Sequence, residues 1–114
     1  MIAKLYYDDK STACRAVLLT VRALDLTLDL QEIDVLNKEN LTPDFIKINP
    51  QHTIPVLVDE DLIICDSHAI SGYLVAKYGS DSTLYPNDPR ERALVDQRLH
   101  FDSNILLPRL RNLL

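Results

Sequence analysis

The sequence predicts an α/β fold in which a mixed β-sheet carries helices on both faces and is followed by one long helix. Three observations support this prediction. Residues 3–30 contain a short apolar run, an amphipathic stretch and an alternating run, which together indicate strand, helix and strand. The segment TIPVLVDEDLIICD (53–66) indicates two strands, and residues 88–114 repeat apolar side chains at helical spacing. The order βαβ, helix, ββ, helix closes naturally as one sheet between layers of helices.

The chain begins with the βαβ unit. Residues 3–7 (AKLYY) form a short strand that is too apolar for the edge of a sheet. Ser11 or Thr12 caps the helix that follows. One apolar stripe runs along this helix: Ala13, Val17, Val21 and Leu24. Residues 26–30 then alternate leucine with polar residues, which indicates a second strand, parallel to the first.

The middle of the chain contains a polar loop and a hairpin. Residues 37–50 are largely polar and include a short helix that starts at Thr42, with proline in its first turn. Residues 56–58 and 62–64 are apolar and flank the acidic residues 59–61. Two such runs joined by a tight acidic turn indicate a β-hairpin.

A helix and a domain boundary follow the hairpin. Asp66 can cap this helix, and Gly79 can end it. We therefore expect a linker over residues 80–87 after a first domain at residues 1–79. Residues 88–114 are expected to be the first helix of an otherwise missing all-α domain.

The last helix is expected to be long and uncovered. Its apolar stripe finds no cover in the rest of the chain: Val95, Leu99, Leu106, Leu110 and Leu113. A single uncovered amphipathic helix is a poor end for a folded protein, so we expect either a truncated helical domain or a partner chain over the stripe. Pro108 should kink this helix, because proline removes a backbone hydrogen bond.

Composition limits the possible partners and the compartment. The chain has 114 residues, 46% of them hydrophobic and 25% charged, as in soluble globular domains. Its net charge of -5 disfavours nucleic acid and anionic membrane surfaces as partners, and no apolar run approaches the roughly 20 residues of a membrane span. Cys14 and Cys65 have neither metal-ligand nor CxxC spacing, which indicates free thiols in the cytoplasm.

The segment Ser-Thr-Ala-Cys (11–14) indicates thiol chemistry at the start of the first helix. A helix N-terminus attracts anions, and Ser11 and Cys14 have the spacing of the two cysteines of a thioredoxin-like CxxC turn. A hydroxyl in the first position prevents redox cycling on the protein but can donate to a sulfur carried by a substrate. The alternatives are that Ser11 is only an N-cap, that Cys14 is only a packing residue, and that Tyr6 or Tyr7 is the donor. A thiol–disulfide oxidoreductase is disfavoured by the missing cysteine.

Two later segments offer further binding groups. In NPQHTIPVL (49–57), Pro55 cannot donate to a strand ladder, so Ile54 keeps free backbone groups. A cis bond between Ile54 and Pro55 would turn these groups toward a ligand. The segment CDSHAISGYLV (65–75) begins a second helix, with Asp66 and Ser67 at its start.

Four motifs in this order resemble a known enzyme family. The chain is similar to cytosolic glutathione transferases of the insect delta/epsilon type, closer to epsilon. The motifs that carry this similarity are SxxCRAV, NPQHTIPVL, DSHAI and LYPNDPRERALVDQRLHFDS. The resemblance implies a thioredoxin-like first domain that binds glutathione. It also implies an all-α second domain that supplies the electrophile pocket and much of a homodimer interface.

The resemblance also implies the roles of particular residues. Ser11 would activate the glutathione sulfur, and Arg111 would line the electrophile side. The glutathione-binding set would be His52, Thr53, Ile54, Pro55, Asp66, Ser67 and His68. Asn40 stands where relatives usually carry a histidine, so the glycyl end of the tripeptide is expected to bind more weakly.

The function that follows is that of a glutathione transferase. It would conjugate glutathione to hydrophobic electrophiles in detoxification, with glutathione as co-substrate and no metal. It would act as a cytoplasmic homodimer, with no nucleic-acid or membrane partner. The alternative is a truncated, non-catalytic module that binds glutathione or dimerises.

Overall fold

The computed structural model describes residues 2–80 and 82–113, which divide into two compact units, Met1–Gly79 and Ser80–Leu114. The first contains β1 (Lys4–Tyr7), α1 (Thr12–Ala23), β2 (Asp29–Glu32), the 3-10 turn η1 (Glu39–Leu41), α2 (Pro43–Ile48), β3 (Val56–Asp59), β4 (Leu62–Cys65) and α3 (Ser67–Tyr78). The second contains the 3-10 turn η2 (Ser82–Leu84), α4 (Pro89–Phe101), the π-helical turn η3 (Asp102–Leu106) and α5 (Leu107–Asn112).

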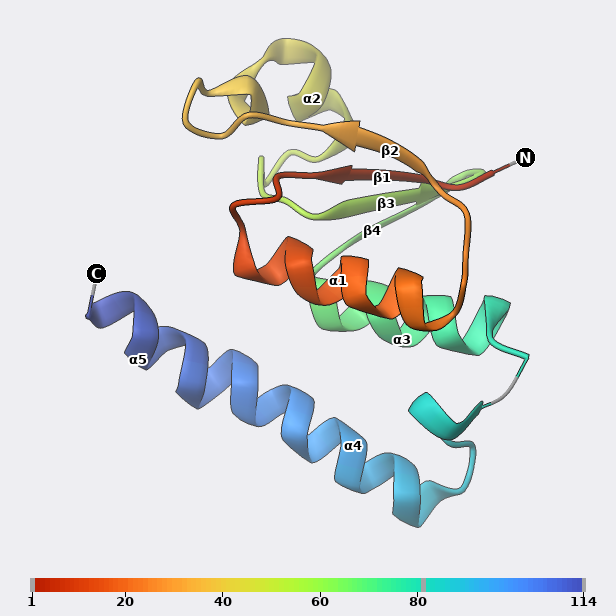
Figure 1. Ribbon diagram of the computed structural model, residues 1–114. Coiled ribbons are helices and arrows are strands. Elements are labelled where there is room, and N and C mark those ends of the chain that lie inside the picture. The colour runs from red at the N-terminus through yellow and green to blue at the C-terminus, as the bar shows by residue number, and fades with distance from the viewer. Residues whose placement is uncertain (1, 81, 114) are drawn as a thin grey trace. The chain divides into compact units, whose positions relative to one another are not determined.

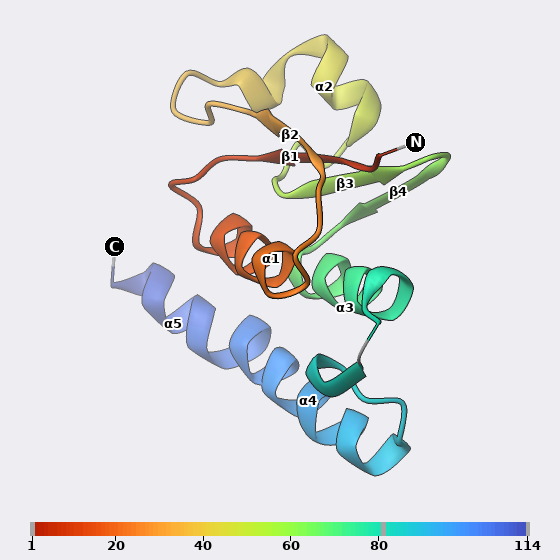
Figure 2. The same cartoon turned by 45° about the vertical axis from the view of Figure 1, so that its right-hand side comes forward.

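The first unit is built on a four-stranded mixed sheet in the order β2-β1-β3-β4. β1 pairs in parallel with β2 and antiparallel with β3, and β3 forms the hairpin with β4. Figures 1 and 2 show α1 and α3 side by side on one face of this sheet and α2 on the other. The predicted fold, a mixed thioredoxin-like sheet with helices on both faces, is confirmed.

The hydrophobic core lies between the sheet and the pair α1 and α3. Leu5 and Leu57 from adjacent central strands are fully buried, as are Ile70 and Leu74 of α3. Two residues of the predicted stripe on α1, Val17 and Val21, complete this core. Burying side chains of this size stabilises a fold by about 1.5–3 kcal/mol each.

The second strand lies later in the chain than the sequence predicts. The ladder to β1 covers Asp29–Glu32 rather than residues 26–30, and all four of its side chains are exposed. Leu26 and Leu28 pack against the core from the connection that precedes β2. The leucine alternation therefore marks the inward-facing side of an extended connection, which obeys the same period of two as a strand.

Helix starts follow the sequence closely. Ser11, Thr42, Asp66 and Asp88 are N-caps, each accepting a hydrogen bond from the backbone N–H three residues later. Gly79 ends α3, but its φ of -77° is not left-handed. A Cβ at this position would lie 2.5 Å from the carbonyl oxygen of Val75, so close approach is the reason for glycine.

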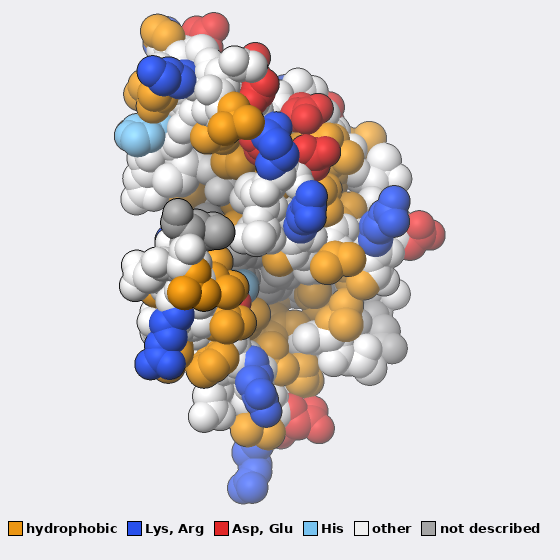
Figure 3. All heavy atoms as spheres, turned by 60° about the vertical axis from the view of Figure 1, so that its left-hand side comes forward, with side chains coloured by type: hydrophobic (Ala, Val, Ile, Leu, Met, Phe, Trp, Pro, Cys, Tyr) orange, Lys and Arg blue, Asp and Glu red, His pale blue; other side chains and the backbone are white. Residues whose placement is uncertain are grey.

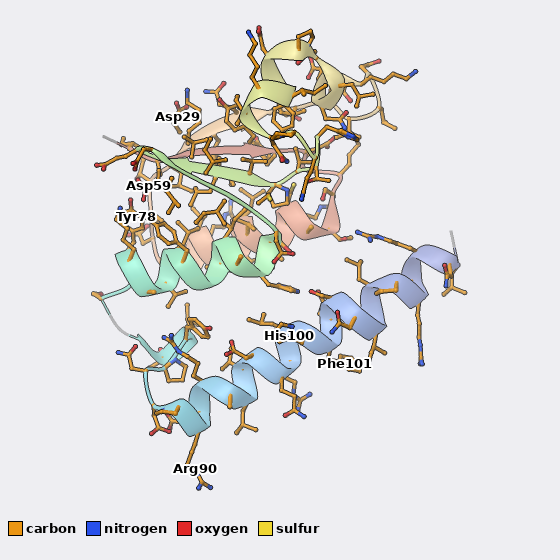
Figure 4. All side chains as sticks on the ribbon, turned by 180° about the vertical axis from the view of Figure 1, so that it is seen from behind. Asp29, Asp59, Tyr78, Arg90, His100 and Phe101 are labelled. Carbon is orange, nitrogen blue, oxygen red and sulfur yellow. The ribbon has the colours of Figure 1, made fainter. Side chains whose placement is uncertain are left out.

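Asp59 does not belong to the tight acidic turn to which the sequence assigned it. It is the last residue of β3, is 3% exposed, and one of its carboxylate oxygens accepts three hydrogen bonds from α3. The donors are the Tyr73 hydroxyl at 2.6 Å, the Tyr78 hydroxyl at 2.7 Å and the Lys77 ammonium at 2.8 Å. Figure 4 shows Asp59 and Tyr78 at the same end of the sheet and helix. These bonds fasten β3 to the last turns of α3.

In the second unit, a π-helical turn lies directly before Pro108, where the sequence predicts a kink. The backbone N–H of Leu107 donates to the carbonyl of Asp102, five residues earlier, directly before the proline that lacks an N–H. Figure 1 shows α4 and α5 continuing as one rod through this turn. No helix in the described chain is both long enough and apolar enough to cross a membrane.

Candidate functional site

A pocket of about 330 Å³ opens in the first unit where the chain passes from β1 into α1. Its lining is largely apolar and comes from three segments of the chain: Asp8, Lys10, Ser11, Val35, Leu36 and Ile54. Two predicted site residues, Ser11 and Ile54, are therefore brought together from positions 43 apart. On the face seen in Figure 3, hydrophobic, cationic and acidic side chains are interspersed, without one dominant charge.

Ser11 enters the pocket as the N-cap of α1. Its Oγ accepts a hydrogen bond of 3.2 Å from the Cys14 backbone N–H. The cap uses a lone pair of the oxygen, so the hydroxyl proton can still be donated to an acceptor in the pocket. The rings of the two alternative donors pack within the fold: the Tyr6 ring meets Phe45 edge-on at 5.7 Å, and Tyr7 packs against the core.

Cys14 is a packing residue, as one reading of the sequence predicted. Its side chain is fully buried, and burial raises the pKa of the thiol. Hydrogen bonds with Ser11 and with the Asp8 backbone N–H act in the opposite direction but do not outweigh burial. A buried, protonated thiol is a poor nucleophile, which argues against redox chemistry at this cysteine.

Ile54 presents backbone groups to the same pocket. The Ile54–Pro55 peptide bond is cis, as the sequence predicted. Among the residues that the structure describes, neither the N–H nor the carbonyl of Ile54 has a hydrogen-bond partner. A partly buried peptide unit with both groups free can pair with an extended peptide ligand.

The turn before Ile54 is held by Asn49, a residue to which the sequence assigned no role. The NH₂ group of its buried side chain donates to the Thr53 carbonyl at 2.9 Å and to the Thr53 hydroxyl at 3.1 Å. The side-chain oxygen of Asn49 accepts from the Gln51 N–H. Thr53 is thus engaged in shaping the turn. A buried amide that meets three local partners fixes the backbone that leads to Ile54.

His52 is exposed, with a left-handed φ of 49°. Its carbonyl accepts a 2.9 Å hydrogen bond from the Asn40 side chain, so Asn40 supports the turn from the loop after β2. This contact gives Asn40 a structural role that the comparison of motifs did not reveal.

The second helix N-terminus lies next to this turn. The Cys65 thiol, at the end of β4, is 3.7 Å from the Gln51 side-chain oxygen. Asp66 caps α3 by accepting from the Ala69 N–H at 3.1 Å, with a φ of 82°. A left-handed φ at a residue other than glycine costs on the order of 1–3 kcal/mol and often marks a functional position. Ser67 and His68 follow and are half-buried.

Asp8 is the charged residue that the sequence reading did not single out. Its 3%-exposed carboxylate accepts from the backbone N–H groups of Lys10, at 3.0 Å, and Val35, at 3.2 Å. The Lys10 N–H is the main cause that lowers the pKa of Asp8, with the Val35 N–H and the Lys10 ammonium adding to it and burial opposing. An aspartate that bonds the N–H two residues later forms a common local turn, so the Asp8-Lys10 half of this arrangement was visible in the sequence.

The remaining predicted residues lie elsewhere. His52, Thr53, Pro55, Asp66, Ser67 and His68 belong to the first unit but do not line the pocket. Arg111 lies on α5 of the second unit and is exposed. Among the described residues, no three His, Cys, Asp or Glu side chains are grouped so as to hold a metal ion.

Comparison with known proteins agrees with this geometry. Residues 5–83 match the family model described as "Glutathione S-transferase, N-terminal domain". The chain is 54% identical over 113 residues to glutathione S-transferase 1 of Manduca sexta, covering 97% of this chain and 52% of that protein. It is 48% identical to glutathione S-transferase D7 of Anopheles gambiae, covering 96% of this chain and 50% of that protein. The chain thus spans about half the length of these relatives.

Solved structures give the same result. A glutathione transferase of Bombyx mori superimposes with a TM-score of 0.93 at 48% identity, covering 98% of this chain and 52% of that one. A homologue from Drosophila mojavensis with bound glutathione gives 0.89 at 50% identity, covering 90% and 47%. An epsilon-class enzyme from the housefly Musca domestica gives 0.92 at 46% identity, covering 96% and 51%. The chain belongs to the glutathione S-transferase family, among relatives of the insect delta and epsilon classes.

Proposed function

We propose that the protein is a glutathione transferase in which Ser11 binds the glutathione sulfur. The observation that carries this proposal is the meeting of the Ser11 hydroxyl and the unpaired Ile54 backbone at one pocket. A tripeptide whose cysteinyl residue pairs with Ile54 can bring its sulfur into this pocket. The glutathione bound in the Drosophila mojavensis homologue supports the choice of tripeptide.

The other groups complement the charges of glutathione. We assign the γ-glutamyl carboxylate to Ser67 and the N-terminus of α3, where the positive end of the helix dipole favours an anion. Asp66 uses one oxygen to cap α3 and keeps the other for the ligand's ammonium group. His52 is assigned to the glycyl carboxylate, and His68 supports the γ-glutamyl end.

Thr53 and Pro55 contribute by shape. Thr53 is tied to Asn49, and the cis bond before Pro55 sets the direction of the Ile54 backbone. Arg111 is assigned to the electrophile side of the reaction. Glutathione is the co-substrate in this scheme, and the scheme uses no metal.

Activation of the thiol is the chemical contribution of Ser11. A free thiol has a pKa of about 8.5, and a hydroxyl donor at a helix N-terminus favours the thiolate. Lowering this pKa by one unit corresponds to about 1.4 kcal/mol and makes the thiolate a large fraction at neutral pH. The proton leaves to solvent, the thiolate electron pair forms the carbon–sulfur bond, and the leaving group departs with its own bonding pair.

The cellular setting follows from the same assignment. We propose a cytoplasmic homodimer that conjugates glutathione to hydrophobic electrophiles in detoxification, without nucleic-acid or membrane partners. Several large apolar side chains of α4, η3 and α5 are exposed: Leu94, Phe101, Ile105, Leu106 and Leu110. This exposure favours contact with further protein. It also motivates the second candidate, a module that binds glutathione or dimerises without turnover.

Substitution of Ser11 tests the proposal. Ser11→Ala should lower kcat/KM for conjugation about 100-fold, the scale for loss of one donor to a developing anion. Because alanine also removes the helix cap, Ser11→Asp is the companion variant: it keeps the cap but sets a negative charge against the thiolate. Thr12→Ala removes an exposed hydroxyl one residue away and should leave the rate unchanged.

The outcomes separate the candidates. Equal rates for Ser11→Ala and Thr12→Ala would remove Ser11 from the mechanism. Saturable glutathione binding by titration calorimetry without conjugation of any electrophile would favour the non-catalytic module. Absence of glutathione binding at millimolar concentration would refute the transferase and the glutathione-binding module, and would leave only a module that dimerises.

A further inference from the structure

We propose that Asp8 is a positioning residue for the electrophile. Its carboxylate holds an apolar wall, formed by Val35 and Leu36, against the turn that carries Ser11. The inference rests on the proposed transferase function, because it names the part of the pocket that receives the non-peptide substrate.

The Asp8 carboxylate contacts two loops. One oxygen of Asp8 accepts from the Lys10 N–H at 3.0 Å and lies 3.2 Å from the Lys10 ammonium. The other oxygen accepts from the Val35 N–H at 3.2 Å, 27 residues along the chain. A single buried carboxylate thus joins the loop before α1 to the loop after β2.

The loop that Asp8 holds is closed by its own hydrogen bonds. The Asp34 N–H donates to the Glu39 carboxylate at 2.6 Å, and the Glu39 N–H donates to the Asp34 carbonyl at 3.0 Å. The Asn37 side chain donates to the Asp34 carboxylate at 2.6 Å. A loop closed on itself in this way moves as one body, so its distance from Ser11 is set by its outside contacts.

This loop is tied to β1 and to the Ser11 turn. At the start of the loop, the Ile33 N–H donates to the Tyr7 carbonyl at 2.7 Å, which continues the β1–β2 pairing. Toward the Ser11 turn, the Val35 N–H of the loop donates to the Asp8 carboxylate. The Asp34 carboxylate of the loop also forms an exposed ion pair with the Lys10 ammonium at 3.9 Å. Exposed ion pairs contribute little, whereas a buried carboxylate with two backbone donors is a strong tie.

The loop offers apolar surface to a ligand. Val35 and Leu36 line the pocket beside Ser11, and Leu36 is 78% exposed. Exposed leucine surface at the wall of a pocket favours an apolar ligand, because covering it stabilises the complex by about 25 cal/mol per Å². Val35 and Leu36 therefore fit the apolar body of an electrophile whose reactive carbon faces the sulfur.

The test compares kinetic constants for the two substrates. Asp8→Asn presents one acceptor oxygen and an NH₂ group to two N–H donors, so the tie to Val35 or to Lys10 is lost. We expect KM for an apolar electrophile such as a chlorinated aromatic to rise about tenfold, with kcat and KM for glutathione within twofold. Asp9→Asn, an exposed neighbour, is the matched control. A general structural defect would raise both KM values together and would overturn the proposal.

Two further measurements keep the proposal testable if Asp8→Asn does not fold. In the unsubstituted protein, the Val35 amide proton should exchange at least tenfold more slowly than that of Leu36, whose N–H has no partner among the described residues. Equal exchange would overturn the tie. Leu36→Ala, at an exposed position, should raise KM for the apolar electrophile alone; an unchanged KM would overturn the wall.

These readouts also distinguish the inference from the proposed function. Failure of the unsubstituted protein to bind glutathione would remove the transferase function, while amide exchange at Val35 would still decide whether Asp8 holds the loop. If the unsubstituted protein conjugates glutathione and Asp8→Asn has the same kinetic constants, the transferase function stands and Asp8 has no positioning role.

Discussion

Replacing Asp59 by asparagine should destabilise the protein by about 2–3 kcal/mol at neutral pH, far from the proposed substrate site. Asp59 is buried and accepts hydrogen bonds from Tyr73, Tyr78 and Lys77. These bonds, with that of Lys77 the largest cause, lower the pKa of Asp59 from 3.8 to about 2. Linkage converts this difference into about 2.4 kcal/mol of stability at pH 7.

The pH dependence of this contribution has a definite sign. Because the folded-state pKa of Asp59 lies below its unfolded value of 3.8, the stabilisation is fully present above that value and is lost as pH falls toward 2. At pH 3 about half of it should remain. The difference in unfolding free energy between the unsubstituted protein and Asp59→Asn should therefore shrink from pH 7 to pH 3.

Urea unfolding followed by circular dichroism measures this difference at both pH values. Asp61→Asn is the matched control: Asp61 is exposed in the adjoining turn, and its substitution should change stability by less than about 0.5 kcal/mol. Equal free energies for the two variants at pH 7, or a difference for Asp59→Asn that does not fall at pH 3, would refute the reasoning.

Two further predictions follow from buried groups near the pocket. Asn49→Ala removes three hydrogen bonds that hold the turn before Ile54, so glutathione affinity measured by calorimetry should fall about tenfold, whereas Gln51→Ala should change it little. Iodoacetamide at pH 7.5 should alkylate Cys65 well before Cys14, because Cys14 is fully buried with a raised pKa while Cys65 is partly exposed. Mass spectrometry of the native protein checks this order, and prior labelling of Cys14 would contradict it.

The features predictable from sequence are those set by local chemistry. The four N-caps were predictable because a Ser, Thr or Asp side chain meets a backbone N–H only three residues away. The hairpin was predictable from two short apolar runs around an acidic turn. The second strand was misplaced because Leu26 and Leu28 alternate with polar residues like a strand, although only the pairing with β1 defines one.

The buried polar residues were not predictable for the opposite reason. Asp59 meets Lys77 18 residues later, and Asp8 meets Val35 27 residues later. Nothing in an acidic turn or in the pair Asp8-Asp9 indicates which carboxylate will be buried. The cost of burying a charge is met only when the fold brings its donors to it, so such a role is a property of tertiary structure.

The contrast between paired and unpaired groups separates supporting residues from ligand-binding ones in this site. Asp8 and Asn49 are buried and fully engaged, and in the described part of the chain no buried side-chain polar atom is left without a partner. The groups assigned to glutathione differ: the Ile54 backbone is unpaired, and the Ser11 hydroxyl keeps a proton to donate. A ligand that pairs with groups already held in place loses less free energy to ordering the protein. Because Asn49 fixes the turn before Ile54, Asn49→Ala should weaken glutathione binding while Gln51→Ala should not. Asp8, which holds the loop of Val35 and Leu36, should instead affect the electrophile.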